Sequence, residues 1–157
     1  MGKETERKFL VTGTGYRKPA EATHYHQGFL STRKERVVRV RIAGDDAYLT
    51  IKGITRGATR KEFEYPIPKD DALEMLEELC EKPAIEKLRY RIPDGEFIWE
   101  VDEFLGVNKG LVIAEIELDH EDQDFPRPPW IGREVTGDPK YYNSNLVSNP
   151  YTKWDEK

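Results

Sequence analysis

Charged residues recur in this sequence as pairs of like sign separated by a single residue. Glu4 and Glu6 form the first pair, and Lys8 continues the same spacing. In a β-strand alternate side chains point to one face, so this spacing would place two carboxylates and an ammonium together. Neighbouring carboxylates repel each other unless a cation lies between them. The segment is therefore a candidate cation site, although an ordinary solvated strand face has the same pattern.

The same spacing recurs along the chain, and the residues between the charged ones are mostly apolar, as Val40 is between Arg39 and Arg41. The acidic members are Glu4, Glu6, Glu62, Glu64, Glu100, Asp102, Glu115 and Glu117. The basic members are Lys8, Arg39, Arg41, Lys52, Lys87 and Arg89. Solvated strand faces usually mix neutral polar residues with charges of both signs. We therefore interpret the set as the lining of an internal channel.

Short alternating segments separated by turns predict the strands that would build this channel. We expect strands at residues 4–11, 23–32, 37–42, 47–52, 60–66, 85–92, 97–104 and 111–118. Turns are expected at residues 44–46 and 93–95, where Gly and Asp meet. Short connections favour an antiparallel sheet. Because each strand has one ionic and one apolar face, the pattern predicts a barrel whose core lies outside, under helices.

Two helices are expected beside the strands. The first follows Pro68, with Asp70 or Asp71 as its cap and Glu74 as the capping-box partner. Its apolar positions recur at helical spacing and are Leu73, Leu76, Leu79 and Cys80. A second, short helix is expected at residues 140–146, with Asp138 as its cap and a proline in its first turn.

Length and composition exclude several classes of protein. A chain of 157 residues fits a single domain, expected to span residues 1–157. The net charge of −5 argues against a dedicated nucleic-acid binder, and the single cysteine, Cys80, excludes a disulfide framework. The sequence contains no apolar run of transmembrane length and no apolar leader. We therefore expect a soluble cytoplasmic protein without a membrane partner; its oligomeric state is not indicated.

A metal-bound polyphosphate is the ligand that would satisfy both kinds of charge. Guanidinium groups match phosphate oxygens in bidentate fashion, and lysines add positive charge. Carboxylates would hold hard divalent cations such as Mg²⁺ or Mn²⁺. The sequence has no Walker A motif, so phosphate recognition would depend on side chains instead of a helix amino terminus.

These motifs together resemble those of the CYTH superfamily, the triphosphate tunnel metalloenzymes. Residues 4–8, Glu-Thr-Glu-Arg-Lys, are similar to the E-x-E-x-K motif of that family. Further similar segments are Arg39-Val40-Arg41, Thr50-Ile51-Lys52-Gly53, Glu62-Phe63-Glu64, Lys87-Leu88-Arg89, Asp102, Glu115-Ile116-Glu117 and Tyr141-Tyr142-Asn143. The resemblance extends along nearly the whole chain, and jointly the motifs are specific.

The resemblance implies an α+β, mainly β fold: an eight-stranded antiparallel barrel, or tunnel, with a charged interior, flanking helices and a short C-terminal lid helix. It also implies hydrolysis or cyclisation of triphosphate compounds with Mg²⁺ or Mn²⁺. The short chain looks most like the bacterial enzymes that act on inorganic triphosphate. The alternatives are a class IV adenylyl cyclase, a nucleoside or thiamine triphosphatase, and a non-catalytic protein that binds polyphosphate or nucleotides.

The resemblance also implies roles for individual residues. The triphosphate would be held by Lys8, Arg39, Arg41, Lys52, Lys87 and Arg89. The metal would be held by Glu4, Glu6, Asp102, Glu115 and Glu117. The residues expected to be catalytic are Glu4, Glu6, Lys8 and Glu117. Glu62 and Glu64 would orient the basic residues without touching the metal, and Tyr141 and Asn143 would belong to the lid.

Overall fold

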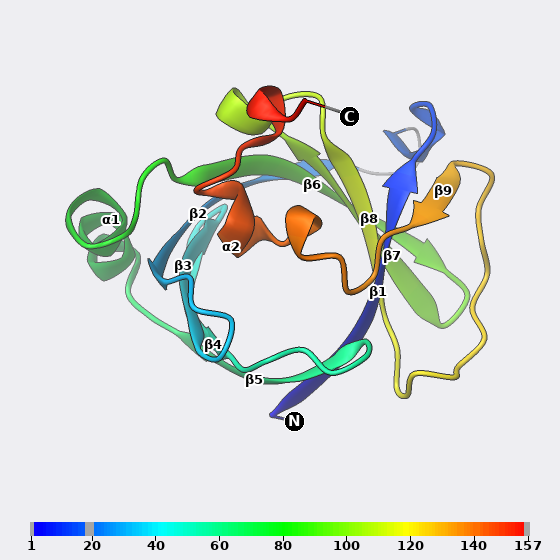
Figure 1. The fold of residues 1–157 in the computed structure, drawn as a ribbon, viewed down its shortest axis with the longest axis horizontal. Coiled ribbons are helices and arrows are strands. Elements are labelled where there is room, and N and C mark those ends of the chain that lie inside the picture. The colour runs from blue at the N-terminus through cyan, green and yellow to red at the C-terminus, as the bar shows by residue number, and fades with distance from the viewer. Residues whose placement is uncertain (1, 18–20, 156–157) are drawn as a thin grey trace.

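The computed structural model describes residues 2–17 and 21–155, and the strands in these ranges form one closed antiparallel barrel (Figure 1). The strands are β1 Lys3–Val11, β2 Ala22–Ser31, β3 Val37–Ala43, β4 Asp46–Lys52, β5 Thr59–Pro66, β6 Ile85–Asp94, β7 Phe97–Phe104, β8 Val112–Glu117 and β9 Ile131–Glu134. They follow the order β5-β4-β3-β2-β6-β7-β8-β1, and the additional pairing of β5 with β1 closes the ring. The predicted eight-stranded barrel is confirmed.

Strand β1 closes the barrel by dividing one of its edges between two partners. Residues 3–5 pair with residues 59–61 of β5, whereas Phe9 and Val11 pair with β9. Along its other edge, residues 6–10 pair continuously with residues 113–117 of β8. This arrangement places Glu4, at the end paired with β5, beside the strands that carry the basic residues.

Short helices and turns complete the chain. They are η1 Gly15–Arg17, α1 Lys69–Glu78, η2 Gly106–Asn108, η3 Pro139–Tyr141, α2 Asn143–Leu146 and η4 Tyr151–Lys153. Helix α1 lies outside the barrel, whereas η3 and α2 lie at its opening (Figure 1). Within the described ranges, no helix combines the length and the apolar character that crossing a membrane would require.

The hydrophobic core lies on the outer surface of the barrel, as the alternating pattern predicted. Helix α1 buries Leu76, and the residue Cys80 just beyond its C-terminus is buried with it, against the cluster that includes Val40. This close approach depends on Gly28 of β2, because a Cβ atom there would lie 2.9 Å from both the Cys80 Cβ and a Leu76 methyl. The helix therefore packs directly on the strand backbone.

An irregular segment covers one of the other two core clusters, and the short helices of the C-terminal segment contribute to the second. One cluster surrounds Trp99, which is fully buried and packs at right angles to Trp130 in the segment that precedes β9. The other includes Leu146 and Trp154 of the C-terminal segment. Residues 126–129 contain three prolines, which cannot continue a helix. On β5, Phe63 and Tyr65 remain 44% and 53% exposed, so part of the outer face has no cover.

Several local predictions were wrong. Helix α1 begins at Lys69 after Pro68 and has no side-chain cap, so Asp70 and Asp71 lie in its first turn, where they favour the helix dipole. Leu73 and Leu79 point away from the barrel and are 46% and 67% exposed.

Two further elements differ from expectation. The second helix is interrupted at Tyr142, which has extended backbone between η3 and α2, although Asp138 does cap η3 through the Lys140 N–H. Strand β6 continues through Pro93 and Asp94, which had been predicted as a turn, and β9 was not foreseen.

Candidate active site

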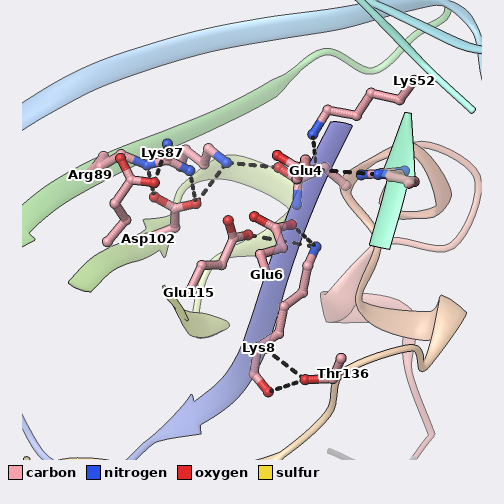
Figure 2. Close-up of polar contacts among 12 residues, drawn as sticks. Glu4, Glu6, Lys8, Lys52, Lys87, Arg89, Asp102, Glu115 and Thr136 are labelled. Atoms are coloured by element: carbon pink, nitrogen blue, oxygen red, sulfur yellow. Dashed lines mark hydrogen bonds and ion pairs between the residues drawn. The ribbon is translucent and has the colours of Figure 1, made fainter. Parts of the chain in front are cut away.

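The acidic side chains of β1 and β8 share one wall inside the barrel. Glu6 lies opposite Glu117 in the antiparallel register, and Lys8 lies opposite Glu115. The Lys8 Nζ is 3.7 Å from a Glu6 oxygen and 3.6 Å from a Glu115 oxygen, as Figure 2 shows. One ammonium is thus placed between carboxylates of two neighbouring strands, whereas the spacing in β1 had predicted only that Glu4, Glu6 and Lys8 share one face.

The carboxylates of this wall differ in how well they are neutralised. The Glu4 carboxylate lies 3.2 Å from Lys52 and 3.4 Å from Arg60. These charges outweigh burial and hold its pKa well below the usual range. In contrast, burial and the nearby charges of Glu115 and Glu4 raise the pKa of Glu6 to about 8. The positive charge of Lys8, which Glu6 shares with Glu115, is therefore not enough to offset burial and the neighbouring negative charges at Glu6.

The donor set of this wall fits a hard divalent cation. Burial, followed by the charges of Glu4 and Glu100, also raises the pKa of Glu117. In the arrangement observed for residues 2–17 and 21–155, no three acidic, histidine or cysteine side chains converge as a ready ligand cluster. The carboxylates of Glu4 and Glu115 are instead turned toward lysines and Arg60. A bound cation would supply the positive charge that Glu6 and Glu117 lack.

The basic side chains of the cavity are held by polar partners within the barrel. The Arg39 Nη2 donates to Thr50 at 3.2 Å and to Glu64 at 3.3 Å. The Lys52 Nζ lies 3.2 Å from Glu62. Burial lowers the pKa of Arg39, and the Glu64 charge opposes this effect. Glu62 and Glu64 thus contact the basic residues, consistent with the orienting role expected for them.

Asp102 lies between Lys87 and Arg89 and is fully buried. Its Oδ1 accepts a hydrogen bond from Arg89 Nε at 2.7 Å. Its Oδ2 accepts one from Arg89 Nη2 at 2.9 Å and also lies 2.7 Å from the Lys87 Nζ (Figure 2). Its carboxylate oxygens are occupied by two cations, and it does not line the cavity. In this structure Asp102 therefore holds the side chains of Lys87 and Arg89 in place. The resemblance had implied that it binds the metal.

The two walls face one cavity of about 290 Å³. The predicted site residues that line it are Glu4, Glu6, Lys8, Arg39, Arg41, Lys52, Glu62, Glu64, Lys87, Arg89, Glu115, Glu117 and Asn143. Tyr141, expected in the lid, lies instead in the outer core, where its ring packs on Trp154 at 5.4 Å between centroids. Its neighbour Tyr142 lines the cavity, with the Lys8 ammonium 5.4 Å from its ring.

Comparison with known proteins agrees with this geometry. The CYTH domain matches residues 2–145 of the chain. The chain belongs to the CYTH domain family. It is 57% identical over 156 residues to an inorganic triphosphatase of Acetivibrio thermocellus, an alignment that covers 99% of this chain and all of the relative. It is also 38% identical over 149 residues to an inorganic triphosphatase of Nitrosomonas europaea, covering 92% and 96% of the two chains.

Solved structures support the assignment to the CYTH fold. A crystal structure of the inorganic triphosphatase NE1496 matches with a TM-score of 0.65 and 34% identity over 92% of this chain and 93% of that one. A putative adenylyl cyclase from Hippeastrum, described as having dominant triphosphatase activity, matches with a TM-score of 0.56 at 15% identity, over 74% and 80% of the two chains. At that identity the second match bears on the fold alone.

Sequence reasoning missed several residues that line the cavity of this CYTH domain. Arg60 contacts Glu4, and its alternation with Glu62 and Glu64 on one strand could have identified it. Tyr25 lines the cavity from β2, a strand without a charged pair. Buried Gln27 lies two residues further along the same strand, and its neutral side chain gave no signal.

Proposed function

We propose that this protein hydrolyses inorganic triphosphate to pyrophosphate and phosphate with Mg²⁺ or Mn²⁺ inside the barrel. The observation that carries the proposal is the convergence of two walls on one cavity: arginines and lysines on one side, and closely spaced carboxyl groups of β1 and β8 on the other. A linear triphosphate with its metal ion has matching charges. The chain's full-length similarity to two inorganic triphosphatases supports the choice of substrate.

The basic wall would bind and orient the phosphates. Arg39, Arg41 and Arg89 present guanidinium groups, which can pair with two phosphate oxygens each. Lys52 and Lys87 add compact charges. Because these groups are buried and already held by protein partners, little reorganisation would be needed when the polyanion binds.

The acidic wall would hold the metal. Glu6 and Glu117, with Glu4 and Glu115 beside them, offer the oxygen ligands that Mg²⁺ and Mn²⁺ prefer. When bound, such an ion neutralises phosphate charge and lowers the pKa of its water molecules. Lys8 lies between Glu6 and Glu115, where its charge opposes burial and lowers the pKa of Glu115 and can also stabilise an anionic phosphate group.

Phosphate release from tripolyphosphate, ATP and thiamine triphosphate, measured side by side with each metal, tests this proposal. We expect turnover of tripolyphosphate to exceed that of both organic triphosphates and to stop when the metal is chelated. Cyclic AMP should not form from ATP. Preference for ATP, or a cyclic product, would contradict the proposed substrate. Tight binding of tripolyphosphate without turnover with either metal would indicate a binding protein.

A further inference from the structure

Two neutral amides join the C-terminal segment formed by η3 and α2, here called the lid, to the cations of the barrel. Arg41 Nε of β3 donates to Gln27 Oε1 of β2 at 2.9 Å. Gln27 Nε2 then donates to Asn143 Oδ1 of α2 at 2.7 Å. The same Asn143 oxygen accepts a hydrogen bond from Lys87 Nζ of β6 at 2.9 Å. The lid is thereby connected to two cations on different strands.

The cations at the two ends fix the orientation of both amides. Arginine and lysine side chains can only donate hydrogen bonds. Asn143 must therefore turn its oxygen toward Lys87, and Gln27 must offer its N–H to Asn143 and its oxygen to Arg41. Gln27 is fully buried, where an amide without partners would be costly. A residue that only filled space at this position would not need an amide.

Arg41 needs such support because its surroundings disfavour its charge. Burial, followed by the charges of Arg39 and Arg89, lowers the pKa of Arg41 to about 9. In the described part of the chain, no salt bridge to a carboxylate is found for Arg41, whereas Arg39 contacts Glu64 and Arg89 contacts Asp102. The contacts that orient it are the Gln27 oxygen and the ring of Tyr25, whose centroid lies 4.7 Å from the Arg41 Cζ.

We propose that Gln27 is a positioning residue whose amide couples the lid to the phosphate-binding cations. Docking of α2 through Asn143 would then fix Arg41 and Lys87 together in the orientation that binds the triphosphate. This inference rests on the proposed function, in which both cations bind phosphate. It adds Gln27, which lies outside the charged motifs, to the residues that support the proposed substrate site. It also implies that docking of the lid contributes to substrate affinity.

The test compares variants that keep the size of Gln27 but change its hydrogen bonds. Gln27→Met removes both bonds, and Gln27→Glu keeps an acceptor for Arg41 but offers no N–H to Asn143. Since hydrogen bonds to charged groups are the stronger ones, Gln27→Met should raise the KM for tripolyphosphate about 10- to 100-fold. Gln27→Glu should also raise KM, whereas a role in packing alone would leave it unchanged. In both variants we expect kcat to change less than KM.

Coupling is measured with Asn143→Ala and the double variant Gln27→Met/Asn143→Ala. If Gln27 and Asn143 act as one unit, the double variant should bind tripolyphosphate no more weakly than the single variant with the lower affinity. Asn145→Ala is the matched control, because the Asn145 side chain bonds to the Pro139 carbonyl within the lid at 2.8 Å. It should leave KM within about twofold of wild type, since it removes only a neutral hydrogen bond of the lid.

The outcomes separate the inference from the proposed function. Additive effects in the double variant, or an unchanged KM in Gln27→Met, would overturn the coupling. Melting temperatures identify variants that fail to fold, in which case Gln27→Glu replaces Gln27→Met in the cycle. Calorimetric binding of tripolyphosphate provides a second readout. If wild type binds tripolyphosphate without hydrolysing it, the proposed function fails while the binding cycle still decides the inference.

Discussion

The acidic and basic walls of the cavity are organised in different ways. On the basic side, Lys87 and Arg89 share the buried Asp102, and Arg39 contacts Glu64. On the acidic side, Glu6 and Glu115 share the single ammonium of Lys8, and burial with the charges of Glu115 and Glu4 raises the pKa of Glu6. The basic side chains are thus held in place before a ligand arrives, whereas the acidic wall needs additional positive charge. If the proposed function holds, the phosphate site would be preformed and the cation site would depend on its ion.

The largest effect should follow from removing a carboxylate of the acidic wall. Glu6→Gln and Glu117→Gln should each lower kcat about a thousandfold, because a metal ligand contributes several kcal/mol of transition-state stabilisation. Binding of tripolyphosphate should change much less. Steady-state kinetics with Mg²⁺ and Mn²⁺ measures both parameters.

Glu86→Gln is the control for this prediction, because Glu86 lies exposed on β6 and contacts His24 at the surface. It should retain wild-type activity. Wild-type kcat in Glu6→Gln and Glu117→Gln would show that neither residue binds the metal. The difference between the two walls would then not contribute to catalysis.

On the basic side, Asp102→Asn should affect the fold more than the metal. The substitution leaves two buried cations without their shared carboxylate, and loss of one partner from a buried ion pair costs about 3–5 kcal/mol. Chemical denaturation should therefore show a corresponding loss in the free energy of unfolding. The dependence of activity on metal concentration should keep its midpoint. A large shift of that midpoint with an unchanged free energy of unfolding would instead indicate that Asp102 is a metal ligand.

Proton uptake on ligand binding should show whether all side chains of the basic wall are already charged before the ligand binds. Burial, opposed by the Asp102 charge, lowers the pKa of Lys87 to about 7. At pH 8 such a lysine is only about one-tenth protonated, and a bound polyanion raises its pKa. Metal-free tripolyphosphate should therefore bind with uptake of up to about one proton, seen by calorimetry in buffers of different ionisation enthalpy.

Lys87→Met should abolish that uptake, and the difference between the two proteins removes any contribution from the ligand's own protonation. Equal uptake by wild type and variant would show that Lys87 is already charged in the free protein.

The smallest effect is expected for Tyr25, whose ring lies 4.7 Å from the Arg41 guanidinium and 4.8 Å from that of Arg89. Tyr25→Leu should weaken tripolyphosphate binding about three- to tenfold, the range expected when a cation–π contact is lost. Tyr25→Phe keeps the ring and should bind nearly as well as wild type. If both variants lose affinity equally, the hydroxyl, and not the ring, supports the basic wall.

The sequence predicted which face of each strand is charged, because alternation in a strand depends only on local geometry. It could not predict how deeply each charged side chain is buried. Glu100 and Asp102 occupy the same face of β7, yet Glu100 lines the cavity and Asp102 is fully buried behind it. That difference arises from pairing with Lys87 and Arg89 on the neighbouring strand, which no local pattern encodes.

Irregular segments were the hardest to predict. Tyr141 and Tyr142 are adjacent aromatic residues, and only the break between η3 and α2 directs the second of them into the cavity. Gln27 is neutral and lies on a strand without a charged pair, so its role depends on contacts with distant parts of the chain. The positions of Tyr142 and Gln27 therefore depend on contacts between the C-terminal segment and the barrel, which a local sequence pattern does not contain.

The divided edge of β1 has a consequence for how the protein folds. Glu4 and Glu6 lie on a strand whose partners are residues 59–61, 113–117 and 131–134. Contacts between residues so far apart in sequence carry a large loop-closure cost and slow folding. During synthesis β1 emerges long before these partners, so its unpaired edges stay exposed until β9 has been made. The strand that carries the carboxylates of the proposed metal site would therefore be among the last to complete its pairing.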